Sequence, residues 1–347
     1  MEQHTQTLLM IAPCSMKKNK IGGAVTKNKS IYLYYNQKYN VSLIDTYWEK
    51  KNILQYFFVR YVKKIYWLLK IAIISRKTDA VILGSNNDNY IRLLHHLKLL
   101  DKTSLFAIGG IVPERVKDSD LPLNVWSQFK NIYVESPQMA AELHQMGLTN
   151  SEFLPNFKKL PYYTAPFKVS DTNEYLSIFY HGRICRDKGI DCLIEGVDEL
   201  AKEGLHVRLD LFGELEEGYD IPMSDEHIKY CGKLNLVGSF KDYEILRREE
   251  LYAFPTKWKG EGLSSSVQDV LAVGKPIIAT RHNLNDMMVK DGYNGFLFEI
   301  DNVNELKGLI KKFYYHRDLI YEMGKNSLKM ADQFRIENVL SSVNLFD

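Results

Sequence analysis

Residues 253–280 have the sequence AFPTKWKGEGLSSSVQDVLAVGKPIIAT. The apolar runs at its two ends predict buried strands, and a helix is predicted between them. Ser265, with Gln268 three residues later, is a capping-box pattern that predicts the start of this helix. Gly274 and Pro276 predict its end. The order strand, loop, helix, strand is typical of an α/β fold with a parallel sheet.

The same alternation runs along the whole chain, where short β-rich runs are separated by helix-like stretches. One helix is predicted by Ser136 as N-cap, Pro137 at the first helical position and Gly147 just past the end. The predicted strands are 8–13, 39–45, 80–86, 104–110 and 131–136 in the first half, and 176–182, 206–213, 228–232, 251–256, 276–280 and 295–299 in the second.

A chain of 347 residues exceeds the size at which a single hydrophobic core stops growing. We therefore expect two Rossmann-like, doubly wound α/β domains that face an interdomain cleft. The expected divisions are an N-terminal Rossmann-like domain (1–160), a linker (161–175), a C-terminal Rossmann-like domain (176–330) and a C-terminal helix (331–347) that packs back toward the first domain.

Cysteine usage and the amino terminus indicate a cytoplasmic protein. The four cysteines have no C-x-x-C spacing, which argues against a zinc site and a disulfide framework. The first lysines follow the short apolar stretch at the amino terminus, whereas a signal peptide carries its charge before that stretch. We expect no export.

Two carboxylates flank an expected anion site in the 253–280 segment. The backbone N–H groups at the start of the predicted helix would lie at the carboxyl edge of a parallel sheet, where phosphates bind. Glu261 precedes that helix and Asp269 lies about one turn inside it. Each can accept hydrogen bonds from vicinal hydroxyls, so the pair suits a sugar nucleotide. The expected donor-binding residues here are Gly262, Leu263, Ser264, Ser265 and Asp269.

A second motif, HGRICRDKG at residues 181–189, follows a predicted strand and precedes a helix. Gly182 allows the backbone to approach a ligand closely. Arg183 and Lys188 supply two cations that could neutralise a departing pyrophosphate. Taken alone, a basic pair at a helix start is more often part of a solvated surface. The pair becomes a stronger signal because the 253–280 motif follows it along the chain.

The 253–280 stretch resembles the E-x7-E signature of the retaining family 4 glycosyltransferases of the GT-B superfamily, and HGRICRDKG resembles a second motif of that family. The FPT…GEG…D form of the stretch is similar to that of members in capsule, exopolysaccharide and O-antigen biosynthesis. In this chain Glu261 is followed by seven residues and then Asp269, so the second carboxylate is one methylene shorter. The resemblance implies that Glu261 contacts the transferred sugar and Asp269 the ribose. It assigns Arg183 and Lys188 to the diphosphate, and makes Glu261, Arg183 and Lys188 the catalytic residues. It also implies that the N-terminal domain (1–160) binds the acceptor and the C-terminal domain (176–330) the nucleotide-sugar donor.

The first half matches the family more weakly. IGGAV (21–25), with Gly22 and Gly23, looks like the family's glycine loop near the donor phosphates, and Gly232 is a further expected donor contact. Many members place a histidine at the end of the fourth strand, but this chain has Gly109 and Gly110 there. We expect these glycines on the acceptor or sugar side, with a backbone N–H in place of an imidazole.

The resemblance implies a hexosyltransferase that moves a sugar from a nucleotide-diphosphate sugar to a lipid-linked glycan, with retention, in bacterial surface polysaccharide biosynthesis. UDP and GDP remain open as the donor nucleotide. Two other functions remain: a sugar-nucleotide epimerase or hydrolase of the same fold, and a non-catalytic partner subunit of another transferase. No cofactor or metal is expected, since no His, Cys or Asp cluster has ligand spacing. The loops that define dehydrogenases and P-loop NTPases are absent, and no nucleic-acid partner is expected.

Residues 53–77 raise the question of a membrane surface. Four cations interrupt this apolar stretch, so it is not a spanning helix. One interpretation is an interfacial helix on anionic lipid at the inner face of the plasma membrane, and the other is a domain helix packed on the sheet. Residues 1–77 carry fourteen Lys or Arg against three acids (Glu2, Asp45 and Glu49), which favours the membrane surface.

Overall fold

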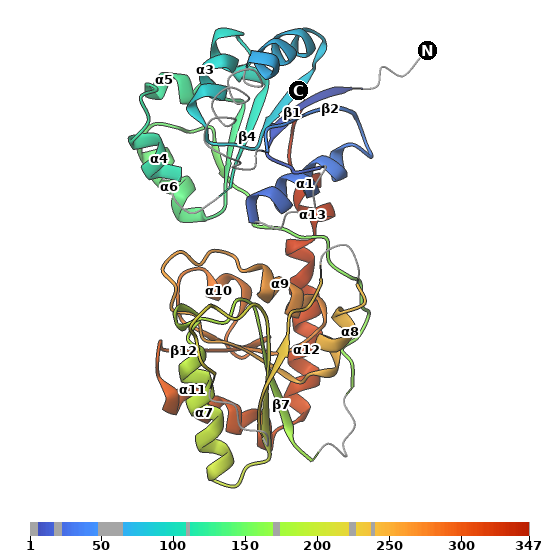
Figure 1. Ribbon diagram of the computed structural model, residues 1–347, viewed down its shortest axis with the longest axis vertical. Helices are drawn as coiled ribbons and strands as arrows, with labels where there is room; N and C mark the ends of the chain where they lie inside the picture. Colours follow the sequence, from blue (N-terminus) through green and yellow to red (C-terminus); the bar gives the residue numbers. More distant parts are fainter. Residues whose placement is uncertain are drawn as a thin grey trace. The chain divides into compact units, whose positions relative to one another are not determined.

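The computed structural model describes residues 6–16, 23–47, 65–108, 112–168, 174–221, 227–236 and 240–346. The chain divides into two compact units, Met1–Lys158 with Ile336–Asp347, and Lys159–Arg335. Within the described residues each unit holds a six-stranded sheet whose strands pair in parallel (Figure 1). The predicted α/β architecture with two parallel sheets is therefore confirmed.

The first unit has the strand order β2-β1-β3-β4-β5-β6. Its strands are β1 (Thr7–Ala12), β2 (Asn40–Asp45), β3 (Ala80–Leu83), β4 (Thr103–Ala107), β5 (Asn131–Val134) and β6 (Ser151–Phe153). Its helices are α1 (Gly23–Tyr35), a helix at residues 65–74, α3 (Asp88–His96), α4 (Val112–Lys117), α5 (Leu123–Trp126), α6 (Pro137–Gln145) and α13 (Ile336–Ser341).

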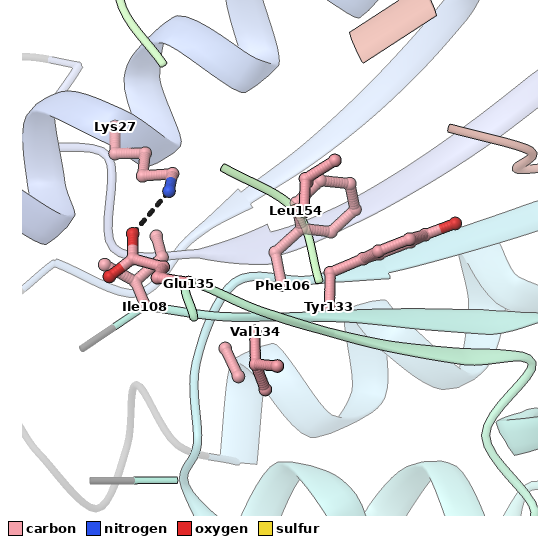
Figure 2. A pocket seen from close by; sticks show the side chains of 8 residues that line it. Lys27, Phe106, Ile108, Tyr133, Val134, Glu135 and Leu154 are labelled. Carbon is pink, nitrogen blue, oxygen red and sulfur yellow. Dashed lines mark hydrogen bonds and ion pairs between the residues drawn. The ribbon is translucent and has the colours of Figure 1, made fainter. Parts of the chain in front are cut away.

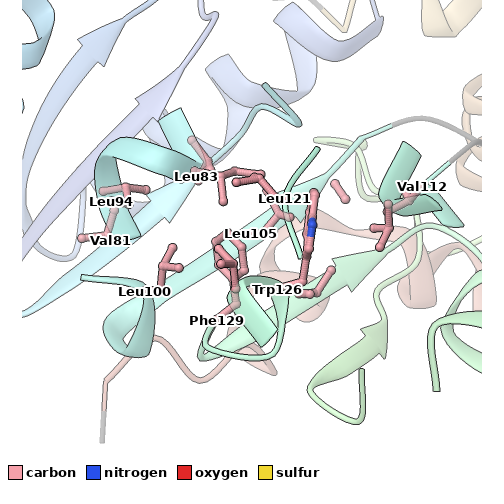
Figure 3. Close-up of a cluster of buried hydrophobic side chains, with 14 of the residues drawn as sticks. Val81, Leu83, Leu94, Leu100, Leu105, Val112, Leu121, Trp126 and Phe129 are labelled. Carbon is pink, nitrogen blue, oxygen red and sulfur yellow. The ribbon is translucent and has the colours of Figure 1, made fainter. Parts of the chain in front are cut away.

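Alternating side chains of β1 enter two different hydrophobic cores, as the period of a strand requires. Leu9 and Ile11 pack with α3, α4, α5 and α6, where Trp126 is among the largest buried side chains (Figure 3). Leu8 and Met10 pack on the opposite face with α1 and with α13, which comes from the end of the chain. Helices thus cover both faces of the sheet.

The second unit has the order β12-β11-β10-β7-β8-β9. Its helices α7 and α11 pack together on one side of the sheet, and α9 packs with α12 (Figure 1). The strands are β7 (Leu176–His181), β8 (Val207–Phe212), β9 (Ile228–Gly232), β10 (Leu251–Phe254), β11 (Ile277–Thr280) and β12 (Gly295–Phe298). The helices are α7 (Ile190–Lys202), α8 (Tyr243–Arg248), α9 (Ser265–Ala272), α10 (Asn285–Met288), α11 (Val303–Tyr315) and α12 (Asp318–Ala331).

Part of the stretch predicted as a linker packs on the second unit. The guanidinium of Arg335 donates hydrogen bonds to the carbonyls of Leu160 and Pro161 at 3.1 and 3.0 Å. The same group lies 3.6 Å from the centroid of the Tyr162 ring. Because Arg335 is buried, these contacts tie residues 160–162 to the segment that follows α12.

Local signals in the sequence anticipate several element ends. The Ser136 side chain caps α6 by accepting from the Met139 N–H, and Gly147 takes φ +92°, so that predicted helix is confirmed. Each predicted strand is present. Most are shorter than predicted, whereas β9 has the predicted bounds and β1 and β4 begin one residue earlier. The structure adds β6, which has only three residues and is therefore too short to show a period.

Candidate functional site

The turn after β7 depends on two glycines with left-handed backbone. Gly182 has φ +150°, and a Cβ there would lie 2.8 Å from the Tyr180 hydroxyl. Gly213, at the end of β8, has φ +153°, and a Cβ there would lie 1.6 Å from the Gly182 carbonyl oxygen. A side chain at Gly213 would thus force β7 and β8 apart. The two glycines place Arg183 at the carboxyl edge of the sheet, where its side chain is exposed.

A third glycine brings the two sequence motifs together. Gly189 has φ +69°, and a Cβ there would lie 1.9 Å from the carbonyl oxygen of Pro255, just past β10. Only glycine permits this approach. As a result the ammonium group of Lys188 donates a hydrogen bond to the carboxylate of Glu261, which also accepts from the Thr256 hydroxyl at 3.0 Å.

The Lys188–Glu261 pair is largely withdrawn from water, with side-chain exposures of 10% and 8%. A charge held in such a place needs its partner, because the cost of desolvation is offset only while the pair is intact. Both of these described hydrogen bonds go to Oε2 of Glu261. The predicted convergence of the segments around 183–188 and 261–269 is thus present for this pair.

Asp269 lies deeper than its expected role suggests. Its side chain is 1% exposed, one carboxylate oxygen accepts from the Tyr243 hydroxyl, and the other lies 3.4 Å from Nε2 of His181. Burial, and next the Asp269 charge, hold the pKa of Tyr243 well above its ordinary value, so Tyr243 remains a proton donor. Asp269 therefore already has a polar partner on each oxygen.

His181 and Tyr243 are site residues that the sequence analysis missed. His181 is the last residue of β7 and directly precedes Gly182, so its position at a strand end was an available signal. Tyr243 opens α8, and no motif marks it. The Tyr252 hydroxyl lies 2.9 Å from the carbonyl oxygen of His181 and 3.2 Å from the Ser266 hydroxyl, which links β7, β10 and α9.

The start of α9 differs from the predicted capping box by one residue. Ser264 is the N-cap, so Ser265 is the first helical residue and the position three beyond the cap is Val267. The Ser264 hydroxyl pairs with the Ser266 hydroxyl at 2.9 Å and makes no cap bond to the helix. The N-cap is therefore Ser264 and not the predicted Ser265, and the N–H groups of the first turn are not capped by the Ser264 side chain.

The remaining predicted residues lie in different places. Gly262 is exposed with open space around its Cα, whereas Leu263 is buried and anchors the loop. Gly232 ends β9 with φ +77°, and its carbonyl accepts from the Gly213 N–H at 2.9 Å. Gly23 is the first residue of α1, in the other unit. Predictions for Gly22, Gly109 and Gly110 fall outside the described residues.

Arg183 lies near an acidic side chain, Glu214, on the loop after β8. The pKa of Glu214 there is lowered first by a hydrogen bond from Lys233 and to a smaller extent by the charge of Arg183. The Tyr180 hydroxyl donates to the Arg183 carbonyl at 2.9 Å and fixes the backbone there. Arg183 thus stands at the same sheet edge with its guanidinium open to solvent.

The first unit has a small pocket at the carboxyl ends of β4 and β5, which the sequence analysis did not identify. Lys27 of α1 points across it to Glu135, with which it forms an ion pair (Figure 2). Its other walls are mostly apolar and come from Phe106, Ala107, Ile108, Tyr133, Val134 and Leu154.

The helix at residues 65–74 presents apolar side chains outward. Ile65, Tyr66, Leu69 and Ile73 are 52%, 57%, 60% and 70% exposed. The core-facing side instead carries Ile71, which is fully buried, with Trp67 and Ile74 packed against the same core. None of the described helices is both long and apolar enough to cross a bilayer. Residues 53–64 of the predicted interfacial helix lie outside the described part of the chain.

Residues 164–330 match the family model described as Glycosyl transferases group 1. An uncharacterized glycosyltransferase of Methanocaldococcus jannaschii, MJ1178, is 28% identical over 167 residues, which are 47% of this chain and 45% of that protein. The capsular polysaccharide biosynthesis glycosyltransferase CapM of Staphylococcus aureus is 25% identical over 251 residues, covering 71% of this chain and 61% of CapM. The chain thus spans about half the length of the curated relatives it matches.

Among solved structures, Anabaena Alr3699/HepE in complex with UDP is similar with a TM-score of 0.69 at 14% identity, covering 97% of this chain and 100% of that one. The galactosyltransferase WaaB of the lipopolysaccharide outer core gives 0.67 at 12% identity, with 97% of each chain covered. These similarities show that the chain has the GT-B fold. The matched family segment contains the Lys188–Glu261 pair and Asp269.

Proposed function

We propose that this chain is a glycosyltransferase that moves a sugar from a nucleotide-diphosphate sugar to a glycan acceptor. The observation that carries the proposal is the Lys188–Glu261 pair beside the start of α9, at the carboxyl edge of a parallel sheet. The match to the glycosyl transferases group 1 model over the same residues supports it.

The chemistry follows from the charge that develops as the donor bond breaks. Transfer leaves a nucleoside diphosphate, and cations and oriented N–H groups stabilise that leaving group. Lys188, Arg183 and the first N–H groups of α9 would supply this stabilisation. Lys188 donates one N–H to Glu261, and its ammonium group has two further N–H groups that would donate to phosphate oxygens.

Glu261 would orient the transferred sugar. Its Oε2 accepts from Lys188 and Thr256, and Oε1 takes part in neither bond, so a sugar hydroxyl can donate to it. We assign no covalent nucleophile. Retention at the anomeric carbon, hexosyl transfer and independence from a bound metal or cofactor belong to the same proposal, and their support is the E-x7-D resemblance.

The acceptor we propose is a lipid-linked glycan of a bacterial surface polysaccharide, reached at the inner face of the plasma membrane. The similarity to CapM supports the polysaccharide class. The outward apolar side chains at residues 65–73 and the fourteen cations of residues 1–77 support contact with anionic lipid. We propose UDP as the first donor nucleotide to test, because the similar HepE was solved with UDP.

Donor turnover with and without acceptor tests the proposal. The purified protein is incubated with UDP-glucose, UDP-N-acetylglucosamine or GDP-mannose, with or without a bacterial lipid-linked glycan extract, and the released UDP or GDP is measured. We expect release that requires the extract and falls about 100-fold in Lys188→Ala, the typical cost of losing one charge-stabilising donor. Equal release without any acceptor would instead indicate a hydrolase, and conversion of the donor sugar without release of nucleotide would indicate an epimerase.

A further inference from the structure

An exposed tryptophan stands beside the Lys188–Glu261 pair. Trp258 lies in the loop between β10 and α9 and is 39% exposed. The ammonium nitrogen of Lys188 is 4.5 Å from the centroid of its indole ring. Trp258 thus presents part of a large aromatic ring to solvent directly beside a buried ion pair, where a bound ligand could cover it.

One asparagine contacts the loop that carries Trp258 at three backbone carbonyls. Asn283 adopts φ +47°, and its side-chain Nδ2 lies 3.3, 3.2 and 3.1 Å from the carbonyl oxygens of Trp258, Lys259 and Glu261, which share its two N–H groups. The Trp258 carbonyl also accepts from the Glu261 N–H at 3.0 Å and lies 3.1 Å from Nε2 of His282. A left-handed asparagine with three carbonyl contacts fixes the turn before any ligand arrives.

Two further contacts fix the direction of the loop and of the ring. The Lys257 N–H donates to the Asp187 carbonyl at 3.0 Å, and the Lys257 ammonium reaches both carboxylate oxygens of Asp301 at 3.0 Å. A Cβ at Gly260 would lie 2.8 Å from the indole, so the ring packs against the Gly260 backbone. The indole is therefore preorganised, and little conformational entropy is lost when a ligand packs on it.

We propose that Trp258 recognises the sugar of the donor by packing its ring on the C–H face of the pyranose. This inference rests on the proposed function, in which Lys188 binds the diphosphate and Glu261 the sugar hydroxyls. A pyranose has its hydroxyls at the rim and C–H groups on its faces, so one carboxylate and one aromatic ring together cover both kinds of surface. The nucleobase lies at the far end of the diphosphate from the sugar, and Trp258 belongs to the same turn as Glu261.

Calorimetric titration separates recognition of the sugar from recognition of the nucleotide. Wild type, Trp258→Ala and Trp258→Phe are titrated with UDP, GDP, UDP-glucose, UDP-galactose, UDP-N-acetylglucosamine and GDP-mannose. For the sugar nucleotide that binds wild type most tightly, we expect Trp258→Ala to weaken binding about three- to tenfold. The parent nucleotide should bind Trp258→Ala with unchanged affinity, and Trp258→Phe should retain most of the affinity for the sugar nucleotide.

Tyr315→Ala is the matched control, because Tyr315 is an aromatic residue of the same unit that is 67% exposed at the end of α11. It should bind both ligands as wild type does. Equal weakening of the nucleotide and the sugar nucleotide in Trp258→Ala would indicate base or phosphate contact and overturn the inference. Unchanged binding of both would overturn it while leaving the proposed function intact, whereas no binding of any nucleotide by wild type would overturn both. Melting temperatures check that each variant is folded.

Discussion

At the scale of single residues, the charges of Lys188 and Glu261 stabilise each other. Each side chain is about nine-tenths buried, so removing either one leaves an uncompensated charge in a poorly solvated place. In the proposed function Glu261 thus has two tasks, since it holds the cation that meets the diphosphate and also contacts the sugar.

Asp269 was expected to contact the ribose, but in the structure its carboxylate already has two protein partners. With one oxygen bonded to Tyr243 and the other near His181, it can act by holding those two side chains as well as by touching a ribose hydroxyl. The E-x7-D spacing anticipates a carboxylate at this edge of the sheet. It does not reveal the two partners, because they come from β7 and α8, far from Asp269 in the sequence.

Asp269→Ala should weaken UDP binding about tenfold, a change of about 1.4 kcal/mol, because it removes a carboxylate from the site and releases His181 and Tyr243. Tyr243→Phe deletes one hydroxyl but keeps Asp269, and it should weaken binding less. Calorimetric titration of both variants with UDP measures the difference. Asp318→Ala, an exposed acid at the start of α12, serves as the control. Wild-type affinity in Asp269→Ala would contradict a role in donor binding.

At the scale of helices and strands, turns that contain glycine bring the parts of the site together. Gly182, Gly189 and Gly213 let three strand ends approach one another more closely than a Cβ would allow. The sequence anticipates the first of these, because a glycine directly after a predicted strand is a strong local signal. It does not show which carbonyl each glycine approaches, because that depends on the pairing of β7 with β8 and β10.

The periodicity of the sequence does not predict which side of the 65–74 helix faces the sheet. Ile65 and Leu69 face outward, while Trp67, Ile71 and Ile74 pack on the core. The helix has apolar residues on nearly all sides, so its pattern does not say which side faces the sheet. An exposed apolar side with nearby cations fits the proposed lipid contact.

Leu69→Glu should reduce binding to anionic vesicles several-fold, because it places a negative charge in the middle of the exposed apolar side. Co-sedimentation with phosphatidylcholine vesicles, with and without phosphatidylglycerol, measures the bound fraction. High salt should weaken the anionic component. Leu123→Glu is the matched control, since Leu123 is 44% exposed on α5 in the same unit. If Leu69→Glu and wild type bind equally, or if wild type ignores phosphatidylglycerol, the proposed membrane contact is wrong.

Two parallel sheets could be predicted at the scale of the whole molecule, because alternation of strands and helices is a pattern that every segment repeats. Each sheet's strand order follows from its pairings, and α13 joins the first unit although it comes from the end of the chain. Long-range features of this kind leave no local signal. The ion pair of Lys27 with Glu135, 108 residues apart, was missed for the same reason.

The central claim is that Lys188 binds the diphosphate of a nucleotide donor, and a thermal-shift panel with UDP, GDP and their sugar conjugates tests it most directly. A ligand that binds only the folded state raises the melting temperature, since at 100 times its Kd it stabilises by about 2.7 kcal/mol. We predict that at least one of these ligands stabilises wild type and Lys259→Ala, which alters an exposed lysine of the Trp258 loop, but fails to stabilise Lys188→Ala. Equal stabilisation of Lys188→Ala, or no stabilisation of wild type by any diphosphate nucleotide, would contradict the claim.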